Sequence, residues 1–281
     1  MASPGNADTY DAMEYAEHPP APQLAPFVRC FWTLAGPAGG GPPEPALPDG
    51  SPELIINLGD AFEAHGPDGA VRRQPPVILV GQITRPFAVA PTGAVSLVAA
   101  RFTPAGACVL HRPMSSLTDT WRDVGAMFPG LHASPGPEAA LSGLADALTR
   151  LCTTARGPGD LVTQAIARIE AQHGAVSMSE VAAELSTTLR QLQRRFQVEV
   201  GINPKLLARL RRFQRVLATW RDEPGQWASV AVSCGYFDQA HLVRDFTELG
   251  GGAPAELLAR MPEFTRMFTP LREGRRPVRS S

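Results

Sequence analysis

The C-terminal half of the chain repeats itself at an offset of 50 residues, and this repeat limits the folds available to it. The aligned identities are Ser179 with Ser229, Leu192 with Leu242, Arg194 with Arg244, Phe196 with Phe246, Gly201 with Gly251, Pro204 with Pro254 and Leu207 with Leu257. Each copy is predicted to hold a short helix, a tight turn, a longer helix and a Gly-x-x-Pro exit. Two copies are too few for a solenoid, whereas a short helix, a turn and a second helix form a helix-turn-helix.

Helices are predicted to fill almost all of the chain beyond the RGPG segment at 156–159. Their expected ranges are 160–174, 177–185, 187–201, 203–225, 227–235, 238–250 and 253–261. The residues suited to cap helix N-termini are Asp160, Thr188, Asn203 (followed by Pro204) and Asp238. The helix at 203–225 joins the two units, and about 18 helical residues at 1.5 Å each would make it about 27 Å long.

The longer helix of each unit has a second face that a hydrophobic core does not need. In the first unit this face carries Arg190, Gln193, Arg194 and Arg195. In the second unit it carries Ala240, Val243, Arg244 and Asp245, with Gln239 one position earlier. Arg can bond guanine with two hydrogen bonds, and Gln can do the same for adenine. The pattern predicts that helices 188–199 and 238–248 read two successive major grooves of DNA, the alternative being two merely solvated faces.

Residues 160–262 resemble the AraC/XylS family of bacterial transcription regulators. The resemblance rests on SEVAAELSTTLRQLQRRFQVEVGINP and ASVAVSCGYFDQAHLVRDFTELGGGAP. It implies a seven-helix DNA-binding domain with two helix-turn-helix units. It also implies base-reading positions at Arg190, Gln193, Arg194, Gln239, Ala240, Val243 and Arg244.

The second unit departs from the polar residues that this family often has at two of those positions. Ala240 and Val243 could contact thymine methyl groups, or this unit could mainly grip the DNA backbone. Asp245 would repel phosphate, so we expect it to face away from DNA or to orient Arg244. His241 could either contact DNA or pack against the short helix.

The front half of the chain has the pattern of a small β-barrel or sandwich followed by helices, so the whole chain is predicted to be an α+β multidomain protein. Strands are expected at 27–34, 53–60, 77–82, 86–90 and 94–102, loops at 36–50 and 65–76, and helices at 104–111, 115–127 and 137–151. The expected domains are a disordered tail at 1–20, a sensory or dimerisation domain at 21–157 with helices over 104–151, the DNA-binding domain at 158–262 and a basic tail at 263–281.

Four segments of the front half, FVRCFWTL, LPDGSPELIINLGD, VGQITRPF and RFTPAGA, resemble an N-terminal domain found on a subset of these regulators. Polar residues in or beside its strands are candidates for an effector pocket: Trp32, Glu53, Asn57, Gln82, Arg85 and Arg101. Glu53 could face Arg85 or Arg101, and a structural ion pair at a barrel rim is the favoured reading. The domain could bind a small-molecule effector, form a homodimer or contact RNA polymerase. The competing function is a sensor or enzyme whose chemistry lies in these strands.

Charge and composition limit the other possibilities. The net charge is −5 over 1–157 and +4 over 158–281, so a polyanion such as double-stranded DNA is expected to meet the back half. The four cysteines form no CxxC pair and the six histidines have no metal-ligand spacing, so we expect no metal, no cofactor and no disulfide framework.

The first twenty residues lack the pattern of a signal peptide, and no catalytic arrangement is found. We therefore expect a cytoplasmic protein that is not an enzyme.

Overall fold

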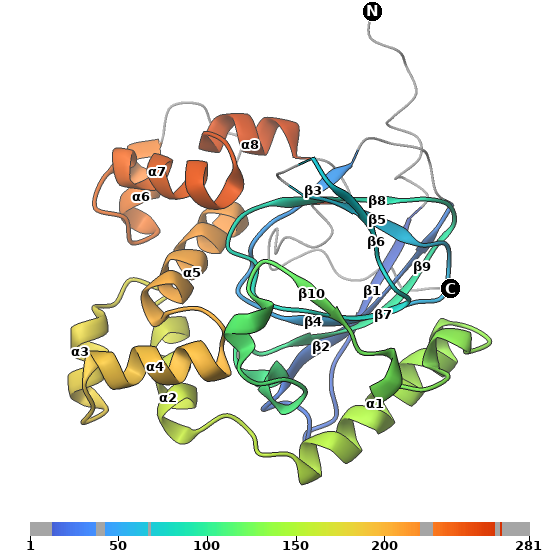
Figure 1. Ribbon diagram of the computed structural model, residues 1–281. Coiled ribbons are helices and arrows are strands. Elements are labelled where there is room, and N and C mark those ends of the chain that lie inside the picture. Colours follow the sequence, from blue (N-terminus) through green and yellow to red (C-terminus); the bar gives the residue numbers. More distant parts are fainter. Residues whose placement is uncertain (1–12, 38–42, 67–68, 220–226, 262–264, 266–281) are drawn as a thin grey trace, which may run out of the picture.

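The computed structural model describes residues 13–37, 43–66, 69–219, 227–261 and 265. Residues 1–12 of the expected N-terminal tail lie outside the described residues, as does all of the expected basic tail except Thr265. The chain forms a β-rich body beside a group of helices (Figure 1). Among the helices of the described ranges, none combines the length and the apolar composition needed to cross a bilayer.

Two antiparallel sheets build the β-rich body. The six-stranded sheet has the order β1 (Glu14–His18), β2 (Val28–Gly36), β9 (Val95–Phe102), β4 (Glu53–Asn57), β7 (Val77–Val80) and β10 (Trp121–Asp123). The four-stranded sheet has the order β3 (Glu44–Ala46), β8 (Phe87–Pro91), β5 (Phe62–His65) and β6 (Val71–Arg73). The two sheets lie opposite each other, as Figure 1 shows, so the predicted β-barrel or sandwich class is confirmed.

The six-stranded sheet is buried on both faces. Trp32 of β2 points into a cluster between the sheets with Leu97 and Phe62. Its neighbour Phe31 points into a second cluster on the other face, because successive side chains of a strand alternate. That outer face is covered by α1 (Pro137–Thr154), which buries Ala140, Leu144 and Leu148 against it. Because both faces are covered, the sequence of a central strand such as β9 is almost continuously apolar.

The expected disordered tail at 1–20 is wrong for residues 14–18, which form β1. This strand pairs with β2, with Glu17 opposite Trp32. Its sequence EYAEH has no apolar run; it is fixed by backbone pairing at the sheet edge and by Tyr15, whose ring centroid lies 6.1 Å from that of Trp32. The short strands β3, β5 and β6 likewise fall in or beside segments expected to be loops or turns.

The helix expected at 115–127 is also wrong. This segment holds a 3-10 turn at Met114–Leu117, then β10, then a second 3-10 turn at Gly125–Met127. Asp119 adopts a φ of 56°, which ends any helix there. β10 pairs with β7 instead. The helix expected at 104–111 is reduced to a 3-10 turn at Gly106–Val109.

Seven helices follow α1 in the described part of the chain. They are α2 (Asp160–Ala171), α3 (Met178–Glu184), α4 (Leu189–Glu199), α5 (Pro204–Thr219), α6 (Trp227–Ser233), α7 (Gln239–Gly250) and α8 (Pro254–Arg260). They share one core in which Leu192, Phe196, Phe213, Leu242 and Phe246 are completely buried. Asn203 caps α5 as predicted, accepting from the backbone N–H of Leu206 at 2.8 Å. Asp160 is instead the first residue of α2, and Gly159 is its N-cap. Residues 220–226 of the expected helix 203–225 lie outside the described ranges.

The helices contact the β-rich body through α4, which packs against the 3-10 turns at Gly106–Val109 and Met114–Leu117, and through hydrogen bonds from α5. Arg211 of α5 donates to the backbone oxygen of Asp49 at 2.6 Å, and Gln214 donates to that of Pro48 at 2.5 Å. A separate hydrogen bond runs from the Thr118 hydroxyl to the backbone oxygen of Gly201, at 2.7 Å. The sequence predicted only a loop at residues 48–49. In the structure, the backbone oxygens of this segment accept the hydrogen bonds from α5.

Gly174, between α2 and α3, offers a stability test of the helical core. Its φ is +79°, and a Cβ there would lie 2.0 Å from the backbone oxygen of Ala208 on α5. Gly251, the C-cap of α7, has the same φ of +79°, but its nearest neighbour is Pro86 Cγ at 3.4 Å. Gly251→Ala should cost about 1 kcal/mol for the left-handed backbone alone. Gly174→Ala should cost about 1–3 kcal/mol more because of the collision with α5.

Urea unfolding of the full chain, followed by circular dichroism, measures both free energies. Equal losses for the two variants would show that α2 and α5 are not packed this closely.

Candidate functional site

The first helix-turn-helix unit consists of α3 and α4. The turn between them contains Ser186 with a φ of 49°. Thr188 then forms a capping box with Gln191: the Gln191 N–H donates to the Thr188 hydroxyl at 3.2 Å, and the Thr188 N–H donates to the Gln191 side-chain oxygen at 3.1 Å. This box fixes where α4 begins, and therefore which of its residues face outward.

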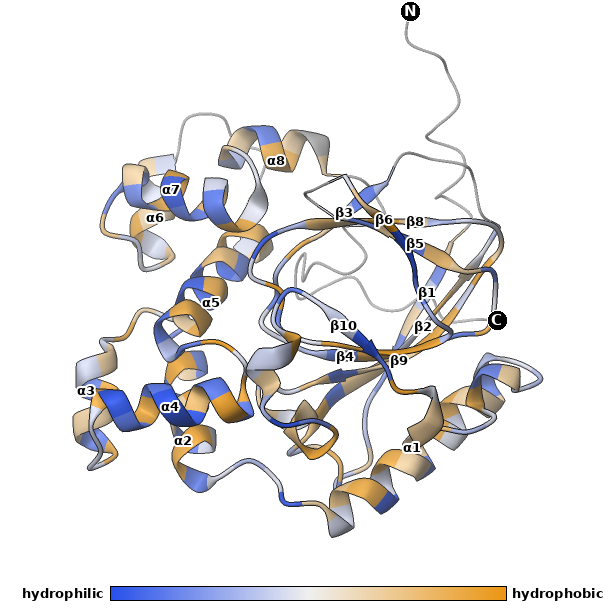
Figure 2. Ribbon diagram, viewed as in Figure 1, coloured by the Kyte–Doolittle hydropathy of each residue, from blue (hydrophilic) through white to orange (hydrophobic). Residues whose placement is uncertain are grey.

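One face of α4 is buried and the other is free. Leu192 and Phe196 are completely buried, while Arg190, Gln193 and Arg194 are exposed. Figure 2 shows α4 as largely hydrophilic in colour. Neither Arg190 nor Arg194 forms an ion pair with another residue of the described ranges. These two guanidinium groups are therefore available to an anionic partner.

Arg195 on the same helix has a different role. It pairs with the buried carboxylate of Glu199 at 2.7 Å, and that carboxylate also accepts from the backbone N–H of Gly159 at 2.7 Å. Arg195 thus helps join α4 to the start of α2.

The second unit, α6 and α7, repeats this construction. Asp238 is the N-cap of α7 and accepts from the backbone N–H of His241 at 2.7 Å. The residues on the outward side of α7 are Gln239, Ala240 and Arg244, which are exposed, and Val243, which is half-buried. The His241 ring packs edge-on against Tyr236, with centroids 5.2 Å apart. His241 was expected to contact DNA or to pack against the short helix; it packs against the turn between α6 and α7, and a DNA contact stays a prediction.

Asp245 points away from this outward side. It is 3% exposed and lies 2.9 Å from Arg209 and 3.8 Å from Arg212, both on α5. Arg212 also lies over the Tyr236 ring, 5.3 Å from its centroid. Asp245 thus faces the core side of α7, and its carboxylate contacts Arg209 and Arg212 of α5 and not Arg244. The hydrogen bonds that Arg209 donates to Glu248 and Asp245 raise its pKa, so its charge persists at any ordinary pH.

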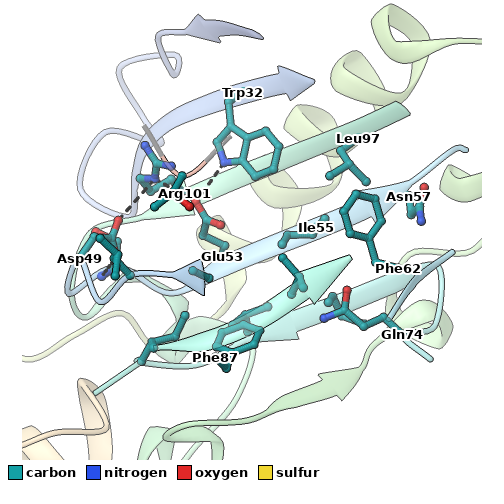
Figure 3. Close-up of a pocket in the computed structure, with 18 of the residues that line it drawn as sticks. Trp32, Asp49, Glu53, Ile55, Asn57, Phe62, Gln74, Phe87, Leu97 and Arg101 are labelled. Carbon is teal, nitrogen blue, oxygen red and sulfur yellow. Dashed lines mark hydrogen bonds and ion pairs between the residues drawn. The ribbon is translucent and has the colours of Figure 1, made fainter. Parts of the chain in front are cut away.

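A cavity of about 130 Å³ lies in the β-rich body. Figure 3 shows side chains from both sheets converging on it. Of the six candidate pocket residues, Trp32, Glu53, Asn57 and Arg101 line it, whereas Gln82 and Arg85 do not. Gln82 is buried elsewhere and donates to the backbone oxygens of Gly50 and Pro104, both at 3.2 Å. Arg85 lies 3.8 Å from Asp119.

The polar end of the cavity is built around Arg101. Its Nε donates to Glu53 at 2.9 Å, and the same Glu53 oxygen accepts from the Trp32 indole N–H at 3.0 Å. Arg101 also lies 3.6 Å from Asp49 and 3.3 Å from Glu17. Burial raises the pKa of Glu53, and the Arg101 charge opposes that rise. Glu53 therefore faces Arg101 and not Arg85, and this ion pair belongs to the cavity wall.

Five polar residues of the cavity wall were not singled out in the sequence: Asp49, Ser51, Gln74, Gln214 and Thr265. Asp49 and Ser51 sit in a segment whose Pro and Gly content suggests an ordinary loop. Gln214 lies on α5, far along the chain, and reaches the cavity only because the two halves pack together. No local pattern marks such a residue. Within the described ranges, no group of His, Cys, Asp and Glu side chains is placed to hold a metal ion.

The two halves of the chain match different protein-family models. Residues 181–260 match a family model described as a helix-turn-helix domain, which covers α4, α5, α6, α7 and α8. Residues 16–123 match a domain of unknown function, DUF6597. That match begins inside β1, in agreement with the correction to the expected tail. No curated protein matches the chain.

Solved structures that align with the chain include ToxT from Vibrio cholerae, at 10% identity and a TM-score of 0.45, covering 84% of this chain and 98% of that one. Another is unsaturated fatty acid bound wild-type ToxT from Vibrio cholerae, at 10% identity and a TM-score of 0.42, covering 89% and 95%. The AraC-like transcriptional activator CuxR has 11% identity and a TM-score of 0.28, covering 74% and 95%.

The buried contact of Asp245 predicts that two substitutions near Arg209 will destabilise the helical region by different amounts. Asp245→Ala removes the carboxylate between two partly buried arginines and should cost about 3–5 kcal/mol of unfolding free energy. Glu248→Ala removes a second partner of Arg209, but its side chain is 63% exposed, so the loss should be below about 1 kcal/mol.

Urea titrations of the two variants, compared with the unaltered chain, measure both changes. Similar small losses in the two variants would contradict the assignment of Asp245 as the anchor of α7.

Proposed function

We propose that the protein is a sequence-specific transcription regulator that reads two successive major grooves with α4 and α7. The observation that carries this proposal is the matched construction of the two helices. Each begins at a side-chain cap, buries a Leu and a Phe four residues apart, and turns Arg and Gln side chains outward. A free face with these residue types is suited to the hydrogen-bond groups of a major groove.

The helix between the units supports simultaneous engagement of both. α5 has 16 residues, which makes it about 24 Å long at 1.5 Å per residue. Figure 1 shows α4 and α7 on either side of it. Successive major grooves on one face of a duplex lie about 34 Å apart. Two recognition helices carried on such a support are suited to that spacing.

The two helices are proposed to contribute unequally to specificity. α4 offers Arg190, Gln193 and Arg194 for hydrogen bonds to bases. α7 offers Gln239 and Arg244, together with the apolar Ala240 and Val243, which suit thymine methyl groups or a closely packed sugar-phosphate backbone. The first unit would therefore discriminate more strongly between sequences.

The β-rich body is proposed to sense a small-molecule effector through its cavity. The segment around Asp49 and Ser51 lines the cavity and is also hydrogen-bonded to Arg211 on α5. Gln214 of α5 lines the cavity itself. An occupant would therefore touch the same residues that hold the helix between the two units. Contact with RNA polymerase, homodimer formation and a cytoplasmic location stay predictions from the sequence.

Substitutions on α4 test the DNA-reading proposal. Arg190→Ala and Arg194→Ala should each cost about 1–3 kcal/mol of discrimination between specific and non-specific duplexes, because each removes a bidentate donor. Arg150→Ala, on the exposed side of α1, removes the same charge far from the helix-turn-helix units and should leave binding unchanged. Mobility-shift titrations on the DNA upstream of the protein's own operon, at fixed salt, measure the three affinities.

Equal, purely non-specific binding by the unaltered chain and the two α4 variants would defeat the proposal. A general loss in Arg150→Ala as well would indicate an effect of net charge and not of base reading.

A further inference from the structure

We infer that the cavity in the β-rich body takes a compact apolar molecule with a hydrogen-bond-donating head, an amine above all, and that it rejects carboxylates. This inference rests on the proposed effector-sensing function and names its ligand class. It follows from the charges around the cavity, from two polar groups on its wall, and from its size.

The charges favour a cation over an anion. Among the described residues that line the cavity, Arg101 is the only cationic one, against the two carboxylates of Asp49 and Glu53. Arg101 is already held by both of them and by Glu17. Its charge is therefore neutralised before a ligand arrives. The three charged residues of the lining sum to −1, so an entering carboxylate would meet net repulsion, whereas an ammonium group would meet net attraction.

Two polar groups on the wall lack partners, and one of them favours a ligand that donates a hydrogen bond. The side-chain oxygen of Gln214 is buried and has no hydrogen-bond partner among the described residues, and the same holds for the Ser51 hydroxyl. Gln214 is 7% exposed and Ser51 is 5% exposed. The Gln214 amide nitrogen already donates to Pro48, so its remaining oxygen can act solely as an acceptor. A buried acceptor without a partner is costly, so the Gln214 oxygen favours a ligand N–H or O–H. The Ser51 hydroxyl can accept from such a group or donate to a ligand acceptor.

The remaining wall sets the size and polarity of the ligand's body. The apolar side chains shown around the cavity in Figure 3 include Ile55, Phe62, Phe87 and Leu97. The volume of about 130 Å³ is close to the roughly 150 Å³ of an apolar cavity that accepts benzene. The cavity therefore suits a body about the size of one aromatic ring, attached to a short donor group.

A matched series of ligands tests the inference on the full-length protein. Phenethylamine, phenethyl alcohol and phenylacetate share a ring and a short linker but carry a cationic, a neutral and an anionic head. Isothermal titration calorimetry and thermal shift should show the amine binding at least about tenfold more tightly than phenylacetate, with the alcohol between them. Equal or tighter binding of phenylacetate would overturn the inference, as would no binding of either the amine or the alcohol at millimolar concentrations.

Charge-removing variants test which groups create the preference. Glu53→Gln keeps an acceptor oxygen for Trp32 and Arg101 but removes the charge, and Asp49→Asn does the same on the neighbouring segment. Either should reduce the advantage of the amine over phenylacetate about tenfold while leaving the affinity for the alcohol nearly unchanged. Asp146→Asn, on the exposed side of α1, is the matched control and should change nothing.

An unchanged preference for the amine in both Glu53→Gln and Asp49→Asn would also overturn the inference. If one variant does not fold, the other decides. DNA affinity of the ligand-free protein is measured separately, so failure of the ligand series leaves the DNA-reading proposal standing. Tight binding of phenylacetate would instead keep the cavity as an effector site for a different ligand class.

Discussion

The buried carboxylate of Asp245, which contacts Arg209 and Arg212, fixes the orientation of α7, the helix proposed to read the second major groove. A buried charge is tolerated when opposite charges and hydrogen bonds surround it, and both arginines come from one helix, α5. The Phe213 and Phe246 rings, with centroids 4.7 Å apart, add an apolar contact between the same two helices. Because Asp245 points inward, its neighbour Arg244 is left on the outward side of α7.

α5 therefore connects three parts of the molecule: α4, α7 and the β-rich body. It follows α4 in the chain, it anchors α7, and its Arg211 and Gln214 side chains bind the β-rich body at residues 48–49. The cavity opens beside that last contact. A change at the cavity wall and a change in the placement of the recognition helices thus involve the same helix, which is the physical basis for proposing that the cavity holds an effector.

The sequence predicted the helical region well because its signals are local. Caps such as Thr188 and Asp238, and apolar pairs such as Leu192 with Phe196, act within one helical turn. The β-rich body was harder. The strand β1 depends on pairing with β2, and the pairing of β10 with β7 overrides an apparent helix, so neither is marked by its own residues. Of the cavity wall, Glu53 and Arg101 were foreseen as partners, while Gln214 could not be, because it reaches the cavity across more than 160 residues of chain.

Selection of binding sequences from random duplex DNA by the purified protein tests the central claim most directly. Two recognition helices on one support should select a motif with two informative blocks, whose centres are about 10–10.5 base pairs apart. One block, assigned to α4, should carry more sequence information than the other. A motif with a single block, or two blocks half a turn apart on opposite faces of the duplex, would contradict the account.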